Sequence, residues 1–196
     1  MFVPLHYQVS EYDCVPTAFI NAITYLFERH EIPPMVISHI YLYSLDTVGR
    51  NSLFGVGGTS KHAVRLLGNW LNSYKMKKFS VYTEFLEKHE VCLTDGSRVH
   101  MCLQEGGIVL CNTLLTPKEE HYLMFIGTDD QWVYCFDSYR RISIRGMKDN
   151  VHILPCEDGR SANLKIKKSW LDQEVTKRFT YGPVHIRECL LMRRIS

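Results

Sequence analysis

Apolar residues are unusually dense near the N-terminus. Between Thr17 and Arg29 apolar residues fall on nearly every face of a helix, and a helix that is apolar on all its faces is typically buried in a core. Pro16 suits the first helical turn, because its missing N–H would have no partner there. Pro33 and Pro34 stop helical structure further on. We therefore expect a buried helix that begins near Pro16.

Weaker periodic patterns indicate three more helices. An apolar stripe at helical spacing follows Pro34 over residues 35–45, and a second covers residues 63–74. Residues 97–105 are a third candidate, which Gly106 would end.

Two serines and a threonine are candidate helix caps. Thr59 or Ser60 can cap the helix at 63–74, and Ser169 a short helix at Trp170. The glycine-rich loop at 55–60 lacks a nucleotide-binding pattern, so we interpret it as a flexible wall of a cleft.

Short apolar and β-branched runs predict strands. Ile108-Val109-Leu110-Cys111 has no polar face and is typical of a fully buried strand, after which a polar loop is expected at 113–120. The runs 121–127 and 132–137 are separated by four residues and predict a hairpin. Further strands are expected at 79–82, 140–145, 162–166 and 188–192. Helices with an antiparallel sheet define an α+β fold, and we expect one domain over residues 1–196.

Composition and charge exclude several classes of protein. The chain is 45% hydrophobic with a net charge of +2, so neither disorder nor nucleic-acid binding is expected. Seven cysteines at irregular spacing, without a CxxC pair, suggest reduced thiols and no disulfide framework, metal or cofactor. There is no basic, then apolar, N-terminal segment and no run of about 18 apolar residues. A cytoplasmic protein without a membrane span is expected, and the oligomeric state stays open.

Cys14 stands at the mouth of the apolar helix. The free N–H groups and positive dipole of a helix N-terminus favour a thiolate. Gln8, six residues upstream, can direct its carboxamide N–H toward the same oxyanion as the Cys14 backbone N–H. A lone cysteine at a helix start is, however, more often a packing residue.

A histidine and an aspartate are brought together by the predicted hairpin. A three-residue loop at 128–130 would set Gly127 opposite Gln131 and His121 opposite Asp137, with Cβ atoms about 5 Å apart. A loop changed by one residue would separate their faces unless a bulge restored the parity. Asp137 would accept the Nδ1 hydrogen of His121 and leave the other ring nitrogen for a thiol proton.

These segments resemble a known peptidase family. Gln8 through Leu26, including DCVPTAF, is similar to the nucleophile segment of C39-type cysteine peptidases and C39-like proteins of the papain-like superfamily. The run from His121 to Gly127, followed by Asp137, is similar to their histidine and acidic segments. The resemblance implies a papain-like cysteine proteinase fold, in which the buried N-terminal helix packs against an antiparallel sheet. It also implies a Cys14 nucleophile, a His121 general base, an orienting Asp137 and a Gln8 oxyanion donor.

Two residues depart from the family pattern. Val15 follows Cys14 where the family usually has glycine, and Ser138 follows Asp137 where it usually has proline. Well-known relatives are fused to transporters and cut leader peptides after a double glycine. No transporter segment accompanies this chain, so that substrate is not expected here.

The sequence leaves three functions open. The first is a cysteine peptidase-like hydrolase that cleaves a peptide or related amide bond in a peptide or protein substrate through a Cys14 acyl-thioester. The second transfers the acyl group to an amine, as an acyltransferase or transglutaminase-like enzyme would. The third is a non-catalytic peptide-binding module.

Overall fold

The computed structural model describes residues 1–49 and 52–195. In these ranges, one sheet contains seven strands in the order β1-β7-β2-β3-β4-β6-β5, and every neighbouring pair is antiparallel. The strands are β1 (Val81–Glu87), β2 (Ile108–Thr116), β3 (Glu119–Thr128), β4 (Trp132–Phe136), β5 (Val151–Ile153), β6 (Leu164–Lys167) and β7 (Glu188–Arg194). The helices are α1 (Cys14–Leu26), α2 (Pro34–Leu42), α3 (Lys61–Ser73), α4 (Arg98–Gln104) and α5 (Lys168–Leu171). The predicted α+β class with an antiparallel sheet is confirmed.

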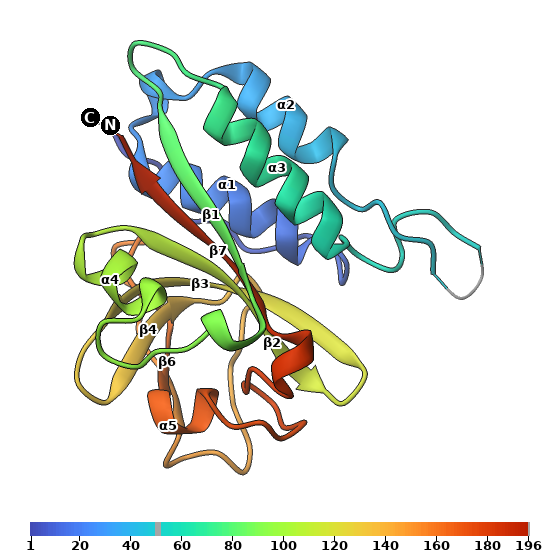
Figure 1. The fold of residues 1–196 in the computed structure, drawn as a ribbon, viewed down its shortest axis with the longest axis vertical. Helices are drawn as coiled ribbons and strands as arrows, with labels where there is room; N and C mark the ends of the chain where they lie inside the picture. The colour runs from blue at the N-terminus through green and yellow to red at the C-terminus, as the bar shows by residue number, and fades with distance from the viewer. Residues whose placement is uncertain (50–51, 196) are drawn as a thin grey trace.

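Helices cover both faces of the sheet. Figure 1 shows α1, α2 and α3 on one side and α4 and α5 on the other. Leu110 and Met124 pack into the core beneath α1 to α3, whereas Cys111 and Phe125 pack into the core beneath α4 and α5. Successive side chains of a strand point to opposite faces. The central strands therefore read as continuous apolar runs because both of their faces are buried.

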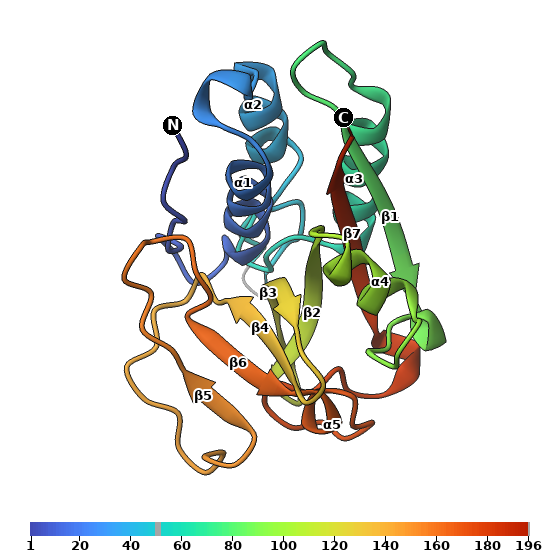
Figure 2. The same ribbon diagram turned by 90° about the vertical axis from the view of Figure 1, so that its left-hand side faces the viewer.

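The sheet is a single layer with β1 and β5 at its two edges. Figure 2 shows these strands at opposite sides of the view, with β2, β3 and β4 between them. The hairpin and the strand predicted at 108–111 therefore occupy the centre of the sheet, against which α1 packs.

Several predicted helix boundaries are confirmed. The apolar N-terminal helix is α1 and has Pro16 in its first turn, although it ends at Leu26, well before the two prolines. The helix predicted after the glycine-rich loop is α3, and the Ser60 hydroxyl caps it by accepting from the Ala63 N–H at 3.2 Å. Gly106 follows α4 with a positive φ of 75°, which glycine adopts without steric cost.

Three predictions about the strands and caps are wrong. Residues 113–116 and 119–120 are not loop but extend β2 and β3, because Thr113 and Leu114 are buried. Residues 140–145 form no strand: Ile142 is 93% exposed, and the Arg141 side chain turns toward Asp137. Ser169 lies inside α5, whose N-cap is Lys167.

Candidate active site

The cleft at the N-terminus of α1 brings the predicted residues together. Its volume is about 1040 Å³, and its lining includes Gln8, Cys14 and His121. α1 begins at Cys14, so the backbone N–H of that residue has no partner within the helix. The Cys14 side chain is partly exposed and packs against the core between α1 and the sheet. A thiol at this position is accessible from the cleft.

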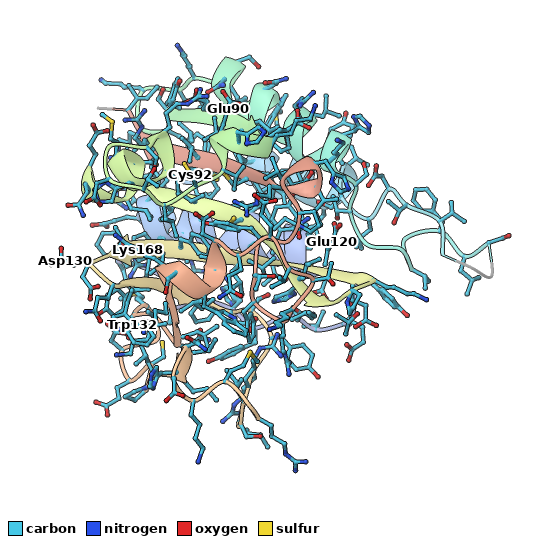
Figure 3. The ribbon with its side chains drawn as sticks, turned by 60° about the horizontal axis from the view of Figure 1, so that its bottom comes forward. Glu90, Cys92, Glu120, Asp130, Trp132 and Lys168 are labelled. Atoms are coloured by element: carbon cyan, nitrogen blue, oxygen red, sulfur yellow. The ribbon has the colours of Figure 1, made fainter. Side chains whose placement is uncertain are left out.

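The cleft lies at one end of the β3–β4 hairpin. Glu120, near the start of β3, is among its lining residues. In Figure 3, Glu120 lies at the opposite end of the hairpin from Asp130 and Trp132. The turn of the hairpin is therefore remote from the site, although it sets the register on which the site depends.

His121 and Asp137 form a buried hydrogen-bonded pair. The Nε2 atom of His121 lies 2.7 Å from Oδ1 of Asp137, and their side chains are only 4% and 2% exposed. The sequence-based choice of ring nitrogen was wrong, because the carboxylate contacts Nε2 and not Nδ1. Nδ1 is thus the ring nitrogen left for a partner other than Asp137.

The predicted register of the hairpin was wrong, but the shared face was right. Gly127 pairs with Tyr134 and not with Gln131. The register then shifts between Phe125 and Gly127, so that Phe125 pairs with Cys135. This shift by one residue puts His121 and Asp137 on the same face of the sheet. The pairing next to the turn, continued without the shift, would have put them on opposite faces. His121 consequently lies diagonal to Asp137, within hydrogen-bonding distance.

Asp137 is held by several partners besides His121. Its carboxylate accepts from the Tyr139 N–H at 2.8 Å and from Nε of Arg141 at 2.5 Å. The Asn163 side chain accepts from the Asp137 N–H at 2.7 Å and donates to the Asp137 carbonyl at 2.8 Å. Asn163 and Arg141 were missed in the sequence, because no local spacing links them to the hairpin.

The charges of the pair stabilise each other. Burial opposes the protonated form of His121, but the hydrogen bond to Asp137 and the interaction with Cys14 outweigh it and raise the pKa of His121 to about 9. Burial likewise opposes ionisation of Asp137, yet the hydrogen bond and charge of His121 and the nearby Arg141 hold the pKa of Asp137 below its usual value. An imidazolium beside a carboxylate is thus the favoured state at neutral pH.

Asp13 fixes the segment between Gln8 and the helix. Its carboxylate accepts from the Val9 N–H at 3.0 Å, the Ser10 N–H at 2.8 Å and the Ser10 hydroxyl at 2.7 Å. Burial disfavours the charge, but these hydrogen bonds hold the pKa of Asp13 below its ordinary value. Asp13 reaches back to the loop and makes no side-chain cap on α1. The position of Asp13 directly before a helix was the sequence signal that could have marked it as a residue that organises this segment.

Gln8 is anchored beside the site. Its carboxamide oxygen accepts from the Ser138 hydroxyl at 2.9 Å, and its Nε2 donates to the Ser10 carbonyl at 2.8 Å. Its backbone N–H donates to the Ser138 carbonyl at 2.9 Å. Ser138, which directly follows Asp137, thus ties Gln8 to the segment that carries the aspartate. The carboxamide nitrogen carries a second hydrogen, so the oxyanion-donor role of Gln8 stays a prediction.

The glycine-rich loop borders the cleft, with Val56, Gly57, Gly58 and Thr59 among the lining residues. The Thr47 hydroxyl donates to the Gly58 carbonyl at 2.8 Å. A Cβ at position 57 would lie 2.3 Å from that hydroxyl oxygen, so only glycine fits without a shift of Thr47. The close approach of these two chain segments explains why glycine stands at position 57.

Residues 1–49 and 52–195 offer no sign of a metal centre or a membrane-spanning helix. They contain no group of three or more His, Cys, Asp or Glu side chains placed to hold a metal ion. In the same ranges, none of the helices combines the length and apolar character needed to cross a bilayer. All seven cysteines are free thiols.

Comparisons with known proteins add no assignment. No model of a known protein family matches the chain, and no curated protein is significantly similar to it.

Proposed function

We propose that this protein is a papain-like cysteine hydrolase that cleaves a peptide or related amide bond. The observation that supports this most is the position of His121, which is hydrogen-bonded to a buried carboxylate and lines the same cleft as a cysteine at a helix N-terminus. A nucleophile, a base and a group that orients the base are the minimum set for thiol catalysis. The packing of α1 against an antiparallel sheet supports the proposal.

The proposed reaction begins with the Cys14 proton on His121. The thiolate attacks the carbonyl carbon, a C–S bond forms, and the oxygen becomes an oxyanion that the Cys14 N–H and the Gln8 carboxamide stabilise. Collapse of this intermediate breaks the C–N bond, and His121 gives its proton to the leaving amine. The product of this half of the reaction is an acyl-thioester on Cys14.

Hydrolysis of the thioester reverses the roles of the groups. Neutral His121 takes a proton from water, and the resulting hydroxide attacks the thioester carbon. The C–S bond breaks, the acid is released, and Cys14 and His121 return to their starting charges. Asp137 remains ionised throughout and keeps Nε2 protonated, so that Nδ1 carries the transferred proton.

Iodoacetamide alkylation at neutral pH tests whether Cys14 is an activated thiol. We expect Cys14 to react at least about tenfold faster than Cys92 and Cys156, the other two partly exposed cysteines. His121→Ala should bring the Cys14 rate down toward theirs, because it removes the imidazolium beside the sulfur. Peptide mapping by mass spectrometry after timed quenching gives all three rates from one sample.

Cys92 and Cys156 serve as internal controls for unfolding, since a general loosening of the chain would accelerate all three thiols together. Equal labelling of Cys14 and Cys92, with no change in His121→Ala, would count decisively against the proposal.

The pH dependence of hydrolysis should carry the signature of His121. Because the folded-state pKa of His121 is raised to about 9, its imidazolium persists through neutral pH and is lost as pH rises through about 9. We expect kcat/KM to fall on an alkaline limb centred there, since the leaving amine then lacks a proton donor.

Cys14→Ala should lower the pKa of His121, measured by NMR titration of the ring, because Cys14 contributes to raising it. An alkaline limb near the ordinary histidine value would contradict this assignment.

A further inference from the structure

One arginine beside Asp137 uses only part of its hydrogen-bonding capacity. The Arg141 side chain is only 7% exposed, and its Nε donates to Asp137. Its Nη2 atom is buried and has no hydrogen-bond acceptor among the residues that the structure describes. Buried guanidinium N–H groups are normally satisfied, because leaving one without an acceptor is costly. Arg141 also lines the candidate active-site cleft, so its guanidinium group borders the space that a ligand would occupy.

A second arginine repeats this feature from a different segment. Arg178 lines the same cleft, and its Nε is likewise buried without an acceptor among residues 1–49 and 52–195. The guanidinium carbons of Arg141 and Arg178 lie 5.0 and 5.3 Å from the centre of the Phe179 ring. Phe179 itself is fully buried. Two cations therefore share one aromatic residue at one part of the cleft.

The charge at this part of the cleft is not balanced. Burial and the neighbouring charge of Arg141 hold the pKa of Arg178 below its ordinary value. Asp137 is the carboxylate that faces Arg141, and it also faces protonated His121. The other carboxylates that line the cleft are those of Glu11, Glu119 and Glu120. Among the described residues, the carboxylate paired with Arg141 is Asp137, and Nε of Arg178 has no acceptor. The region therefore attracts an anion.

We propose that Arg141 and Arg178 form a subsite for a carboxylate of the peptide substrate, adjacent to the Cys14–His121 pair. The guanidinium group presents N–H donors in a planar fork that matches the two oxygens of a carboxylate. This inference rests on the proposed function for its substrate class, because a peptide brings carboxylates in acidic side chains and at its C-terminus. The subsite would select acidic or C-terminal segments over neutral ones.

Binding to the Cys14→Ala protein tests the subsite without catalysis. Three probes separate the sources of the anion: N-acetyl-aspartyl-alanine amide, N-acetyl-alanyl-alanine with a free C-terminus, and the neutral N-acetyl-alanyl-alanine amide. We expect one or both anionic probes to bind at least about tenfold more tightly than the neutral one and to shift the Arg178 Nε–H resonance in NMR spectra. The probe with the larger effect identifies the carboxylate that is recognised.

Arg178 is the residue to vary, because Arg141 also holds Asp137. Arg178→Met should abolish the preference for the anionic probe, whereas Arg178→Lys should retain part of it. The Lys variant keeps the test valid if the Met variant unfolds, which thermal unfolding would reveal. Equal affinity for charged and neutral probes, or an unchanged preference in a folded Arg178→Met protein, would overturn the proposal.

Inorganic phosphate is the competing probe. Tight phosphate binding without any preference between the peptides would reject a carboxylate subsite. Because these measurements use a protein without the nucleophile, they are independent of the alkylation experiment. Slow Cys14 alkylation together with carboxylate selectivity would remove the proposed hydrolase and leave the subsite.

Discussion

Replacing His121 with alanine is expected to lower the rate of peptide hydrolysis by roughly 10³- to 10⁴-fold. The substitution removes both the acceptor of the Cys14 proton and the donor to the leaving amine. The chain should stay folded, because Asp137 keeps its hydrogen bonds from the Tyr139 N–H and from Arg141. Steady-state rates, with circular dichroism to verify folding, provide the measurement.

His152→Ala is the matched control for that substitution. His152 lies in β5, where its ring packs edge-on against Trp132 at 4.9 Å, and it is not among the residues that line the cleft. Loss of this imidazole should change the rate by less than about twofold, in keeping with a surface substitution remote from the site. A His121→Ala protein that kept a tenth of the activity would rule out His121 as the proton carrier.

The central elements were predictable because burial on two faces leaves a strong pattern. The central parts of β2 and of the β3–β4 hairpin are largely apolar and β-branched, and α1 is apolar on nearly all sides. The edge of the sheet leaves no such pattern. β5 has three residues, two of them exposed, whereas the alternation at 140–145 resembles a strand but pairs with none. Pairing at an edge is decided by tertiary contacts that local periodicity does not encode.

The candidate site was predictable in its residue types and less so in its geometry. The shared face of His121 and Asp137 depended on a register that the turn alone does not determine. Asp129 accepts from the Gln131 and Trp132 N–H groups, and these bonds shape the turn. The register shift between Phe125 and Gly127 then returns His121 and Asp137 to one face of the sheet. A bulge leaves one strand residue unpaired and has no reliable local sequence signal, so its position emerged only from the structure.

The supporting residues were the least predictable part of the site. Arg141, Asn163 and Arg178 lie on segments that follow the hairpin in the chain, and each reaches the cleft or Asp137 only through the folding of those segments. Arginine and asparagine are usually exposed, so the residue types alone gave no reason to place these side chains beside a buried carboxylate. The structure thereby adds two arginines and an asparagine to the predicted Cys, His and Asp: Arg141 and Asn163 hold Asp137, and Arg178 lines the cleft.

Asp137→Ala is expected to reduce the free energy of unfolding by about 3–5 kcal/mol, which is typical of removing one partner from a buried ion pair. The substitution leaves His121 and the buried Arg141 without the carboxylate that faces both. Asp137→Asn should cost less, because its side-chain oxygen can still accept one hydrogen bond. Urea unfolding at neutral pH gives both values, with Asp130→Ala, an exposed position in the hairpin turn, expected to change stability by less than about 0.5 kcal/mol.

The pH dependence of unfolding distinguishes this loss of pairing from a packing defect. The lowered pKa of Asp137 contributes stability above its unfolded-state value, and that contribution is lost as pH falls through the folded-state pKa. The raised pKa of His121 contributes stability that is complete below about 6.5 and is lost as pH rises through about 9. Asp137→Ala should lose the Asp137 contribution and the part of the His121 contribution that comes from Asp137, so the loss of stability relative to the wild type should be largest between these limits and shrink outside them. A deficit that stayed constant across this range would assign Asp137 to packing and remove the electrostatic basis of the proposed proton transfer.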